Sequence, residues 1–143
     1  MIIPLKKINS YAKLPLRAKD GDAGTDLYSV EAVKIKPFTQ QLVHTGLMGA
    51  IPEGYVGLVH PRSGLALKKG ITVLNTPGTI DSGYRGEWCV ILYNATSQIV
   101  TIDKGERIAQ LVVQKVELPV FQEVDELTDS QRGQAGFGST GNN

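Results

Sequence analysis

Short runs of apolar and β-branched residues recur along the chain, and this spacing limits its fold more than any other feature. Glycine, proline, asparagine or charged pairs separate the runs, and no gap leaves room for a crossover helix. Parallel strands need such crossovers, so the pattern predicts antiparallel strands that form a sandwich or barrel. The runs are 26–29, 33–35, 41–45, 55–60, 71–74, 88–93, 99–102, 108–116 and 119–123.

One segment, residues 63–69, carries the signals of a short helix. Ser63 is of a residue type that favours the N-cap, and Lys68 and Lys69 suit the last turn. Gly70 follows at the position where helices commonly end. The sequence therefore predicts one short helix in an otherwise all-β domain.

The composition fits a single folded domain with an appended arm. A chain of 143 residues is long enough to bury a core, and 41% hydrophobic with 20% charged residues is ordinary for a globular protein. From Thr128 the chain becomes polar and glycine-rich, with Phe137 as its only large apolar side chain. We expect a β-barrel domain over residues 1–127 and a flexible C-terminal arm over 128–143.

Charge and hydropathy argue against several functional classes. The formal net charge of +1 does not fit a sequence-independent nucleic-acid binder. Apolar runs fall well short of the ~20 residues that span a bilayer, and the N-terminus lacks the pattern of a secretory signal. Cys89, the single cysteine, is expected to be a small buried hydrophobe. We expect a cytoplasmic protein with no nucleic-acid or membrane partner.

The segment between the runs 71–74 and 88–93 is the main candidate site. Its Asn, Pro, Ser and Gly residues predict a β-hairpin with a wide mouth. The mouth contains the carboxylate of Asp81, the amide of Asn75 and the ring of Tyr84. With the hairpin backbone these groups could hold a planar heterocycle. A plain hairpin loop whose aspartate caps its own backbone is an equally good interpretation of this stretch.

Two other stretches have the chemistry of an anion site. Arg62 has a planar guanidinium suited to phosphate oxygens, and Ser63 adds a hydroxyl at the expected helix start. The same residues also fit a helix cap beside a surface arginine. In the arm, Arg132, Ser139 and Thr140 stand among glycines whose backbone amides could wrap an anion.

Other candidate sites fail on spacing. The acidic cluster of Asp20, Asp22, Asp26 and Glu31 lacks the ligand order and helical flanks of a calcium loop. The two histidines have no metal-like spacing and no cysteine partner in the sequence, so both are interpreted as structural. Ser63 lacks the Gly-x-Ser-x-Gly context of a serine hydrolase.

Five motifs, in order, resemble those of the trimeric dUTP pyrophosphatases (dUTPases). Each would be weak alone, but the five together cover nearly the whole chain. They are 23–27 (AGTDL), 61–66 (PRSGLA), 78–87 (GTIDSGYRGE), 105–111 (GERIAQL) and 132–141 (RGQAGFGSTG).

The resemblance implies a distorted antiparallel jelly-roll β-barrel and hydrolysis of dUTP to dUMP and pyrophosphate. It also implies a Mg²⁺ cofactor and a homotrimer in which three chains contribute to each active site. Such an enzyme keeps uracil out of DNA and supplies dUMP for thymidylate synthesis.

The resemblance also assigns residue roles. Asp81 matches the general base that activates the attacking water, and Asp26 matches an outer-shell ligand that reaches Mg²⁺ through water. Tyr84 matches the ring that packs under the deoxyribose. Phosphate contacts are implied for Arg62, Ser63, Gly64, Gln110, Arg132, Ser139 and Thr140. Contacts to the uracil and its surroundings are implied for Asn75, Gly78, Ile80, Phe137 and Gly138.

Two alternatives are weighed against this assignment. A dCTP deaminase-like relative shares the fold, but those enzymes have a Glu on the strand after the hairpin, and residues 88–93 contain no carboxylate. A non-catalytic dUTP-sensing module predicts loss of Asp81 or of the arm, and both are intact in this sequence.

Overall fold

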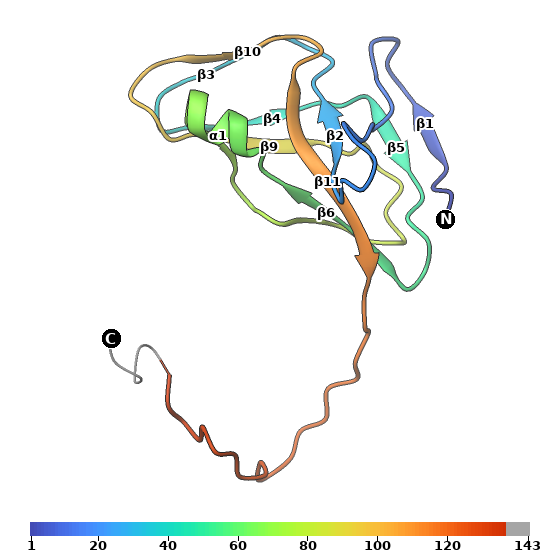
Figure 1. Ribbon diagram of the computed structural model, residues 1–143, viewed down its shortest axis with the longest axis vertical. Coiled ribbons are helices and arrows are strands. Elements are labelled where there is room, and N and C mark those ends of the chain that lie inside the picture. The colour runs from blue at the N-terminus through green and yellow to red at the C-terminus, as the bar shows by residue number, and fades with distance from the viewer. Residues whose placement is uncertain (137–143) are drawn as a thin grey trace.

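The computed structural model describes residues 1–136, and these form an antiparallel all-β barrel with one short helix, as the sequence predicts (Figure 1). The elements in chain order are β1 (Leu5–Lys7), β2 (Thr25–Tyr28), β3 (Val33–Ile35), β4 (Gln40–Val43), β5 (Leu47–Gly49), β6 (Tyr55–His60), α1 (Ser63–Lys69), β7 (Ile71–Val73), β8 (Gly78–Ile80), β9 (Val90–Asn94), β10 (Val100–Ile102) and β11 (Arg107–Lys115).

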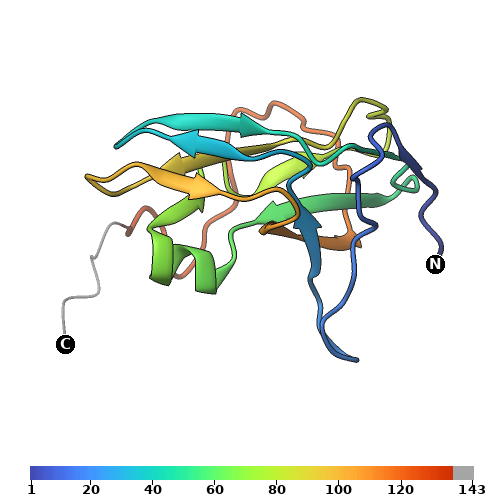
Figure 2. The same ribbon diagram turned by 90° about the horizontal axis from the view of Figure 1, so that it is seen from above.

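The strands form four sheets, of which two matter for the site. The larger has the order β2-β11-β6-β8, and the other has the order β4-β9-β7. Strand β11 lies between β2 and β6 and crosses the middle of the barrel, as Figure 1 shows in orange. Two-stranded sheets, β1-β5 and β10-β3, complete the barrel, and the view from above in Figure 2 shows the layers that the strands make.

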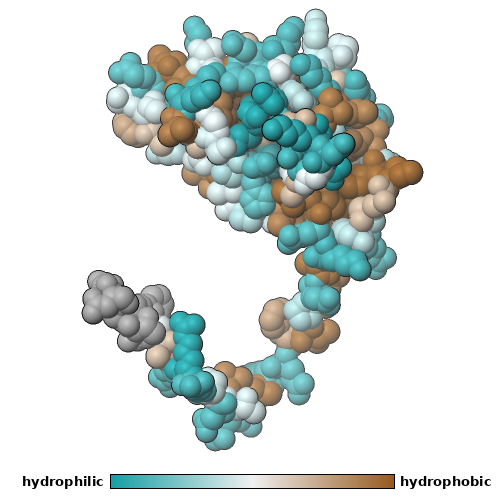
Figure 3. Space-filling model, in the orientation of Figure 1, coloured by the Kyte–Doolittle hydropathy of each residue, from teal (hydrophilic) through white to brown (hydrophobic). Residues whose placement is uncertain are grey.

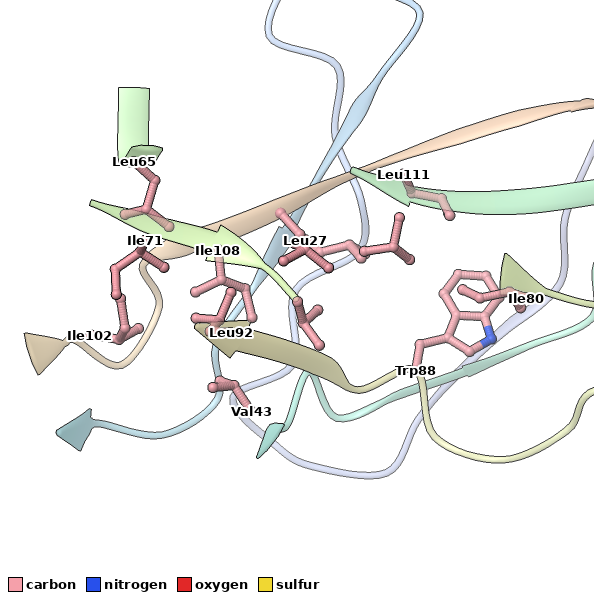
Figure 4. Close-up of a cluster of buried hydrophobic side chains, with 14 of the residues drawn as sticks. Leu27, Val43, Leu65, Ile71, Ile80, Trp88, Leu92, Ile102, Ile108 and Leu111 are labelled. Atoms are coloured by element: carbon pink, nitrogen blue, oxygen red, sulfur yellow. The ribbon is translucent and has the colours of Figure 1, made fainter. Parts of the chain in front are cut away.

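The core lies between these sheets and follows the strand alternation. Strand β9 has the burial pattern of alternating buried and half-buried residues, with Val90, Leu92 and Asn94 pointing inward. Leu92 packs in a cluster with Ile71 and Ile108, all fully buried (Figure 4). Each such side chain contributes roughly 1.5–3 kcal/mol when removed from water.

Trp88 fills the core beside Ile80 and Leu111 (Figure 4). Gly49 lies directly against its ring, so that a Cβ at position 49 would overlap the indole. The glycine is therefore required for a close approach and not for an unusual backbone angle. This contact fixes the position of the chain just before β9.

Helix α1 differs from the prediction at its start. Arg62 is the N-cap and makes no side-chain capping hydrogen bond, so Ser63 is the first helical residue and not the cap. Gly70 ends the helix in the left-handed conformation at φ 62°, and its N–H donates to the Ala66 carbonyl at 3.0 Å. No helix among residues 1–136 has the length and apolar character needed to cross a bilayer.

Most strands lie within two residues of their predicted bounds, with two kinds of exception. The predicted strand 119–123 is wrong: β11 ends at Lys115, and residues 117–135 are exposed and irregular. Strands β1, β5 and β8 were not predicted, because lysines (LKK) or a glycine (LMG, GTI) interrupt these three-residue strands and leave no apolar β-branched run.

Beyond β11 the chain leaves the barrel (Figure 1). Val116 makes the last hydrogen bond to the barrel, to the Gly54 carbonyl, and those described from 117 to 136 stay within that segment. Apolar and polar side chains are interspersed along it (Figure 3). The most exposed are Leu118, Val120, Phe121 and Leu127.

Candidate active site

A cavity of about 720 Å³ lies where β6 ends and α1 begins. Its lining includes Arg62, Ser63, Gly64, Gln110 and Asp26, all singled out by the sequence analysis. We call it the anion cleft. The structure thus gathers residues from three separated motifs around one space.

Strand register explains this gathering. Gln110 on β11 is opposite His60 on β6 and opposite Asp26 on β2, so three neighbouring strands present these residues in a row. The chain then passes from His60 through Pro61 into the N-cap of α1. The Nε2 of Gln110 donates to the Pro61 carbonyl at 3.1 Å, which ties the row of strands to the helix start.

Asp26 is the electrostatic centre of the anion cleft. One carboxylate oxygen accepts from the Nε of Arg62 at 2.8 Å, and the other accepts from Arg107 at 3.2 Å. Only 13% of the Asp26 side chain is exposed, so its charge is held close to both guanidinium groups. The carboxylate therefore sets the orientation of Arg62 toward the cleft.

Arg107 is a cleft residue that the sequence analysis missed. It belongs to the motif 105–111, but only Gln110 of that motif was singled out. The available signal was an arginine at the start of a strand that carries Gln110 three residues later.

A second, smaller cavity of about 180 Å³ lies in the mouth of the hairpin. Its lining includes Asn75, Gly78, Ile80 and Tyr84, again residues from the sequence analysis. We call it the hairpin pocket. Polar groups of the hairpin and apolar residues of the core, such as Trp88, share its wall.

The mouth is wide because the hairpin divides between two sheets. Strand β7 pairs with β9, as predicted for the two flanking runs, whereas β8 pairs with β6 in the other sheet. The turn Asp81–Glu87 then returns to β9 and is closed by the Tyr84 hydroxyl, which donates to the Glu87 carbonyl at 3.0 Å.

The two cavities share no lining residue. Successive residues of a strand point to opposite faces, and β6 places His60 in the anion cleft but Val59 in the hairpin pocket. Asp81 is exposed on the turn beyond β8 and lines neither cavity. One chain therefore presents the two groups of site residues on different sides of β6.

Comparison with known proteins identifies the family. The dUTPase family model matches residues 10–141. The chain belongs to the dUTPase family. It is 53% identical over 140 residues to the deoxyuridine 5'-triphosphate nucleotidohydrolase of Rhodococcus erythropolis, covering 97% of this chain and 85% of that protein.

Solved dUTPase structures agree with the fold. A mutant of the Staphylococcus bacteriophage 80alpha dUTPase with dUpNHpp superposes with a TM-score of 0.90 at 31% identity, over 98% of each chain. A mutant dUTPase from phage phi11 of S. aureus, described with a structural Mg(II) ion, has a TM-score of 0.80 at 28% identity over 88% of this chain and 98% of that one. The jelly-roll architecture expected from the resemblance is confirmed.

Half of the dUTPase arm motif, residues 137–141, lies beyond the described part of the chain. Arg132 is exposed, and its Nε donates to the Ala135 carbonyl at 2.9 Å, away from both cavities. Phe137, Gly138, Ser139 and Thr140 lie outside the described residues. Their implied roles remain predictions.

A further polar cluster of this dUTPase was not found from the sequence. His44 Nδ1 lies 2.8 Å from a carboxylate oxygen of Glu87 and 3.5 Å from the Cys89 sulfur. His44 therefore has a cysteine neighbour, and Cys89 is only partly buried, which corrects both expectations. The signal is invisible locally because 43 residues separate His44 from Glu87.

The three groups change one another's protonation. The hydrogen bond to Glu87 raises the pKa of His44, and the nearby carboxylate charges add to this against a lowering by burial. For Glu87, burial raises the pKa, but hydrogen bonds from His44 and from the Gly46 N–H outweigh it and leave the pKa lowered. Burial, with the Glu87 charge, raises the pKa of the Cys89 thiol to about 11.

Proposed function

We propose that this protein hydrolyses dUTP to dUMP and pyrophosphate, with Asp81 activating a water that attacks the α-phosphate. Membership of the dUTPase family supports dUTP as the substrate. The structural observation that carries the proposal is the pair of cavities, one with ion-paired arginines and one lined by a hairpin backbone. The reaction removes dUTP as a source of uracil in DNA and supplies dUMP for thymidylate synthesis.

The anion cleft would bind the triphosphate. Arg62 uses its Nε for Asp26, which leaves the two terminal amino groups of the guanidinium for phosphate oxygens. Ser63 adds a hydroxyl, and Gly64 has nothing within 4 Å of the position a Cβ would take, so the backbone is open to a ligand. The amide of Gln110 lies on the same wall.

The hairpin pocket would bind the base and the sugar. Asn75 and the backbone of Gly78 and Ile80 offer donors and acceptors to the edge of uracil. The ring of Tyr84 is held against the turn by its hydroxyl, in a position to pack under a deoxyribose and to clash with a 2′-hydroxyl.

Asp26 fits an indirect role toward Mg²⁺. A carboxylate has about four lone-pair positions, and the two arginines occupy one on each oxygen of Asp26. Positions remain for a water of a hydrated ion, whereas direct ligation would compete with both arginines. When bound, Mg²⁺ would reduce the charge of the substrate phosphates, which are its usual ligands.

Asp81 would act as the general base. Its carboxylate accepts a proton from the attacking water while the water oxygen forms a bond to the α-phosphorus. The bond from the α-phosphorus to the bridging oxygen then breaks, and pyrophosphate leaves. Exposure of Asp81 on the turn leaves it free to meet a substrate that another surface holds.

We infer that the active site is shared in a homotrimer. The anion cleft of one chain and the hairpin of a second would face each other, since a single chain has them on different sides of β6. A third chain would contribute its arm over the site. The exposed apolar side chains at Leu118, Val120 and Phe121 support contacts of this segment with another chain.

The test is the turnover of Asp81→Asn with dUTP and Mg²⁺. Without its general base the enzyme should lose about 10²–10⁴-fold in kcat while binding a non-hydrolysable dUTP analogue normally. Asp20→Asn, an exposed aspartate outside both cavities, is the matched control and should keep full activity. Near-normal turnover by Asp81→Asn would assign the base to another group. Wild-type protein that binds dUTP without releasing pyrophosphate, or that deaminates dCTP, would contradict the proposed reaction.

A further inference from the structure

The side chains of His44, Glu87 and Cys89 converge beside the start of β9, apart from the anion cleft and its arginines. One ligand atom from each lies within 4.8 Å of the others, and no other such group of three occurs among residues 1–136. The set combines an imidazole nitrogen, a carboxylate oxygen and a sulfur. We propose that it is a site for a divalent transition-metal ion of the zinc type.

Of the two separations measured from His44, the one to Cys89 matches tetrahedral coordination and the one to Glu87 is shorter. With bonds of about 2.0 Å to nitrogen, 2.0 Å to oxygen and 2.3 Å to sulfur, a tetrahedral ion separates nitrogen from sulfur by about 3.5 Å and nitrogen from oxygen by about 3.3 Å. The corresponding separations at His44 are 3.5 Å to Cys89 Sγ and 2.8 Å to Glu87 Oε2. An ion therefore needs only a small outward shift of the carboxylate, and it replaces the protons that now join these groups.

The backbone holds the ligands in place before any ion arrives. The second oxygen of Glu87, Oε1, accepts from the Gly46 N–H at 2.7 Å, which orients the carboxylate and leaves Oε2 for the ion. The Thr45 hydroxyl donates to the Trp88 carbonyl at 2.6 Å, so the chain after His44 is fixed to the segment between Glu87 and Cys89. Next to this contact, Val43 on β4 is paired with Val90 on β9, so the antiparallel pairing of the two strands extends it.

The ligand set selects the class of metal. Sulfur and imidazole favour zinc, cobalt and similar ions, whereas Mg²⁺ prefers oxygen ligands alone. Three protein ligands leave a fourth position, and the His44 side chain is 46% exposed, so water or a small ligand can reach it. The metal class thus differs from the Mg²⁺ proposed for the nucleotide, although Glu87 and Cys89 also line the hairpin pocket.

The experiment is a Co²⁺ titration of the full-length, reduced, metal-free protein, followed by absorption. Because the chain has one cysteine, a thiolate-to-cobalt charge-transfer band can come only from Cys89. The band should saturate at one ion per chain, Zn²⁺ should abolish it, and excess Mg²⁺ should leave it unchanged.

Variants identify the other ligands. His44→Ala and Glu87→Gln should each weaken Co²⁺ binding at least about tenfold, and Cys89→Ser should abolish the charge-transfer band. His60→Ala, which removes the other histidine, is the matched control and should bind like wild type. Circular dichroism of each metal-free variant checks that it is folded, and His44→Gln, which retains a polar side chain, replaces His44→Ala if that variant fails.

Three results would overturn the proposal. The first is Co²⁺ binding without the sulfur band, and the second is displacement of Co²⁺ by Mg²⁺. The third is equal binding by folded His44→Ala, His44→Gln and wild-type protein, which would exclude His44 as a ligand. None of these measurements involves dUTP, so their failure is separate from any failure of the proposed hydrolysis.

Discussion

The anion cleft and the hairpin pocket share strand β6, which gives His60 to one and Val59 to the other, yet they are built by different means. The cleft takes its character from charged side chains, with Asp26 fixing Arg62 and Arg107 at 2.8 and 3.2 Å. The pocket takes its shape from backbone, where the hairpin leaves one sheet and joins the other. The cleft is therefore suited to a charged group, and the pocket to a small ring of matching shape.

The difference teaches how one β-barrel can divide a binding task. Alternation along β6 sends Val59 to one side and His60 to the other, so proximity in sequence becomes separation in space. In the shared site proposed above, a substrate that carries both a base and a triphosphate would use the cleft of one chain and the hairpin of another.

The largest expected effect comes from separating the two surfaces onto different chains. Arg62→Ala disables the cleft and Asp81→Asn disables the hairpin, and each variant alone should be nearly inactive. After subunit exchange at equal amounts, roughly a quarter of the sites in a closed three-fold ring should combine two intact surfaces. Pyrophosphate release by the mixture measures the recovery.

The control is a mixture of wild type with a chain that carries both Arg62→Ala and Asp81→Asn. In this mixture only wild-type chains supply an intact cleft or an intact hairpin. Subunit exchange is checked with chains of two different masses. If exchange occurs and activity stays at the level of the separate variants, the cleft and the hairpin of one chain serve the same site.

A change confined to the hairpin pocket should alter selectivity more than turnover. Tyr84→Leu removes the ring that would exclude a 2′-hydroxyl, so hydrolysis of UTP relative to dUTP should rise about tenfold. Tyr84→Phe keeps the ring and loses only the hydrogen bond to the Glu87 carbonyl, so its ratio should stay near that of wild type. The ratio of kcat/KM values for the two substrates is the measurement. An unchanged ratio in Tyr84→Leu would move discrimination to the backbone.

Two glycines allow the surfaces to be disturbed one at a time. A methyl group at Gly24 would lie 2.5 Å from the Gln110 amide oxygen, and one at Gly86 would meet the Tyr84 ring. Gly24→Ala should therefore raise KM for dUTP roughly fivefold, the equivalent of one hydrogen bond of about 1 kcal/mol. Gly86→Ala should instead raise the UTP:dUTP ratio.

Gly83→Ala is the matched control, because nothing lies within 4 Å of the position its Cβ would take. It should change neither KM nor the ratio. If Gly24→Ala altered selectivity and Gly86→Ala altered only KM, the division of tasks between the cavities would be the reverse of that proposed.

The smallest expected effect concerns the pH dependence of stability in metal-free protein. Because the pKa of His44 is raised, its ion pair stabilises the folded protein fully at pH values below 6.5, the ordinary pKa of histidine. This stabilisation is lost as the pH rises through the raised pKa. Because the pKa of Glu87 is lowered, its carboxylate stabilises the folded protein fully at pH values above 4.5, the ordinary pKa of glutamate. This stabilisation is lost as the pH falls through the lowered pKa.

His44→Ala should accordingly destabilise the protein most between pH 4.5 and 6.5, by at most about 1 kcal/mol because the His44 side chain is exposed and solvent screens the pair. Urea unfolding at pH 5.5 and at pH 8.5 measures the difference. Glu87→Gln should show the same pH dependence, and a loss that is equal at both pH values would indicate packing and not charge.

The sequence alone determined the fold class and most of the strands. Frequent short β-branched runs with turn residues between them predict an antiparallel sandwich or barrel, and Gly70 marks the helix end because few other residues adopt its backbone angle. Arg62 stood out because a planar guanidinium suits phosphate oxygens, whereas Gln110 and Asp26 were brought forward only by the resemblance of their motifs to those of dUTPases. These signals are local, so they survive in the sequence.

Only the tertiary structure decided which of those residues meet. The pairing of β11 with both β2 and β6 places Asp26 beside Arg62 and Arg107, and nothing in the spacing of 36 and 81 residues predicts that. The contact of His44 with Glu87 and Cys89 depends likewise on the pairing of β4 with β9. Strand register brings together residues that are distant in sequence, and the alternation of side chains along β6 places Val59 and His60 in different cavities. Neither is written in any local stretch of the chain.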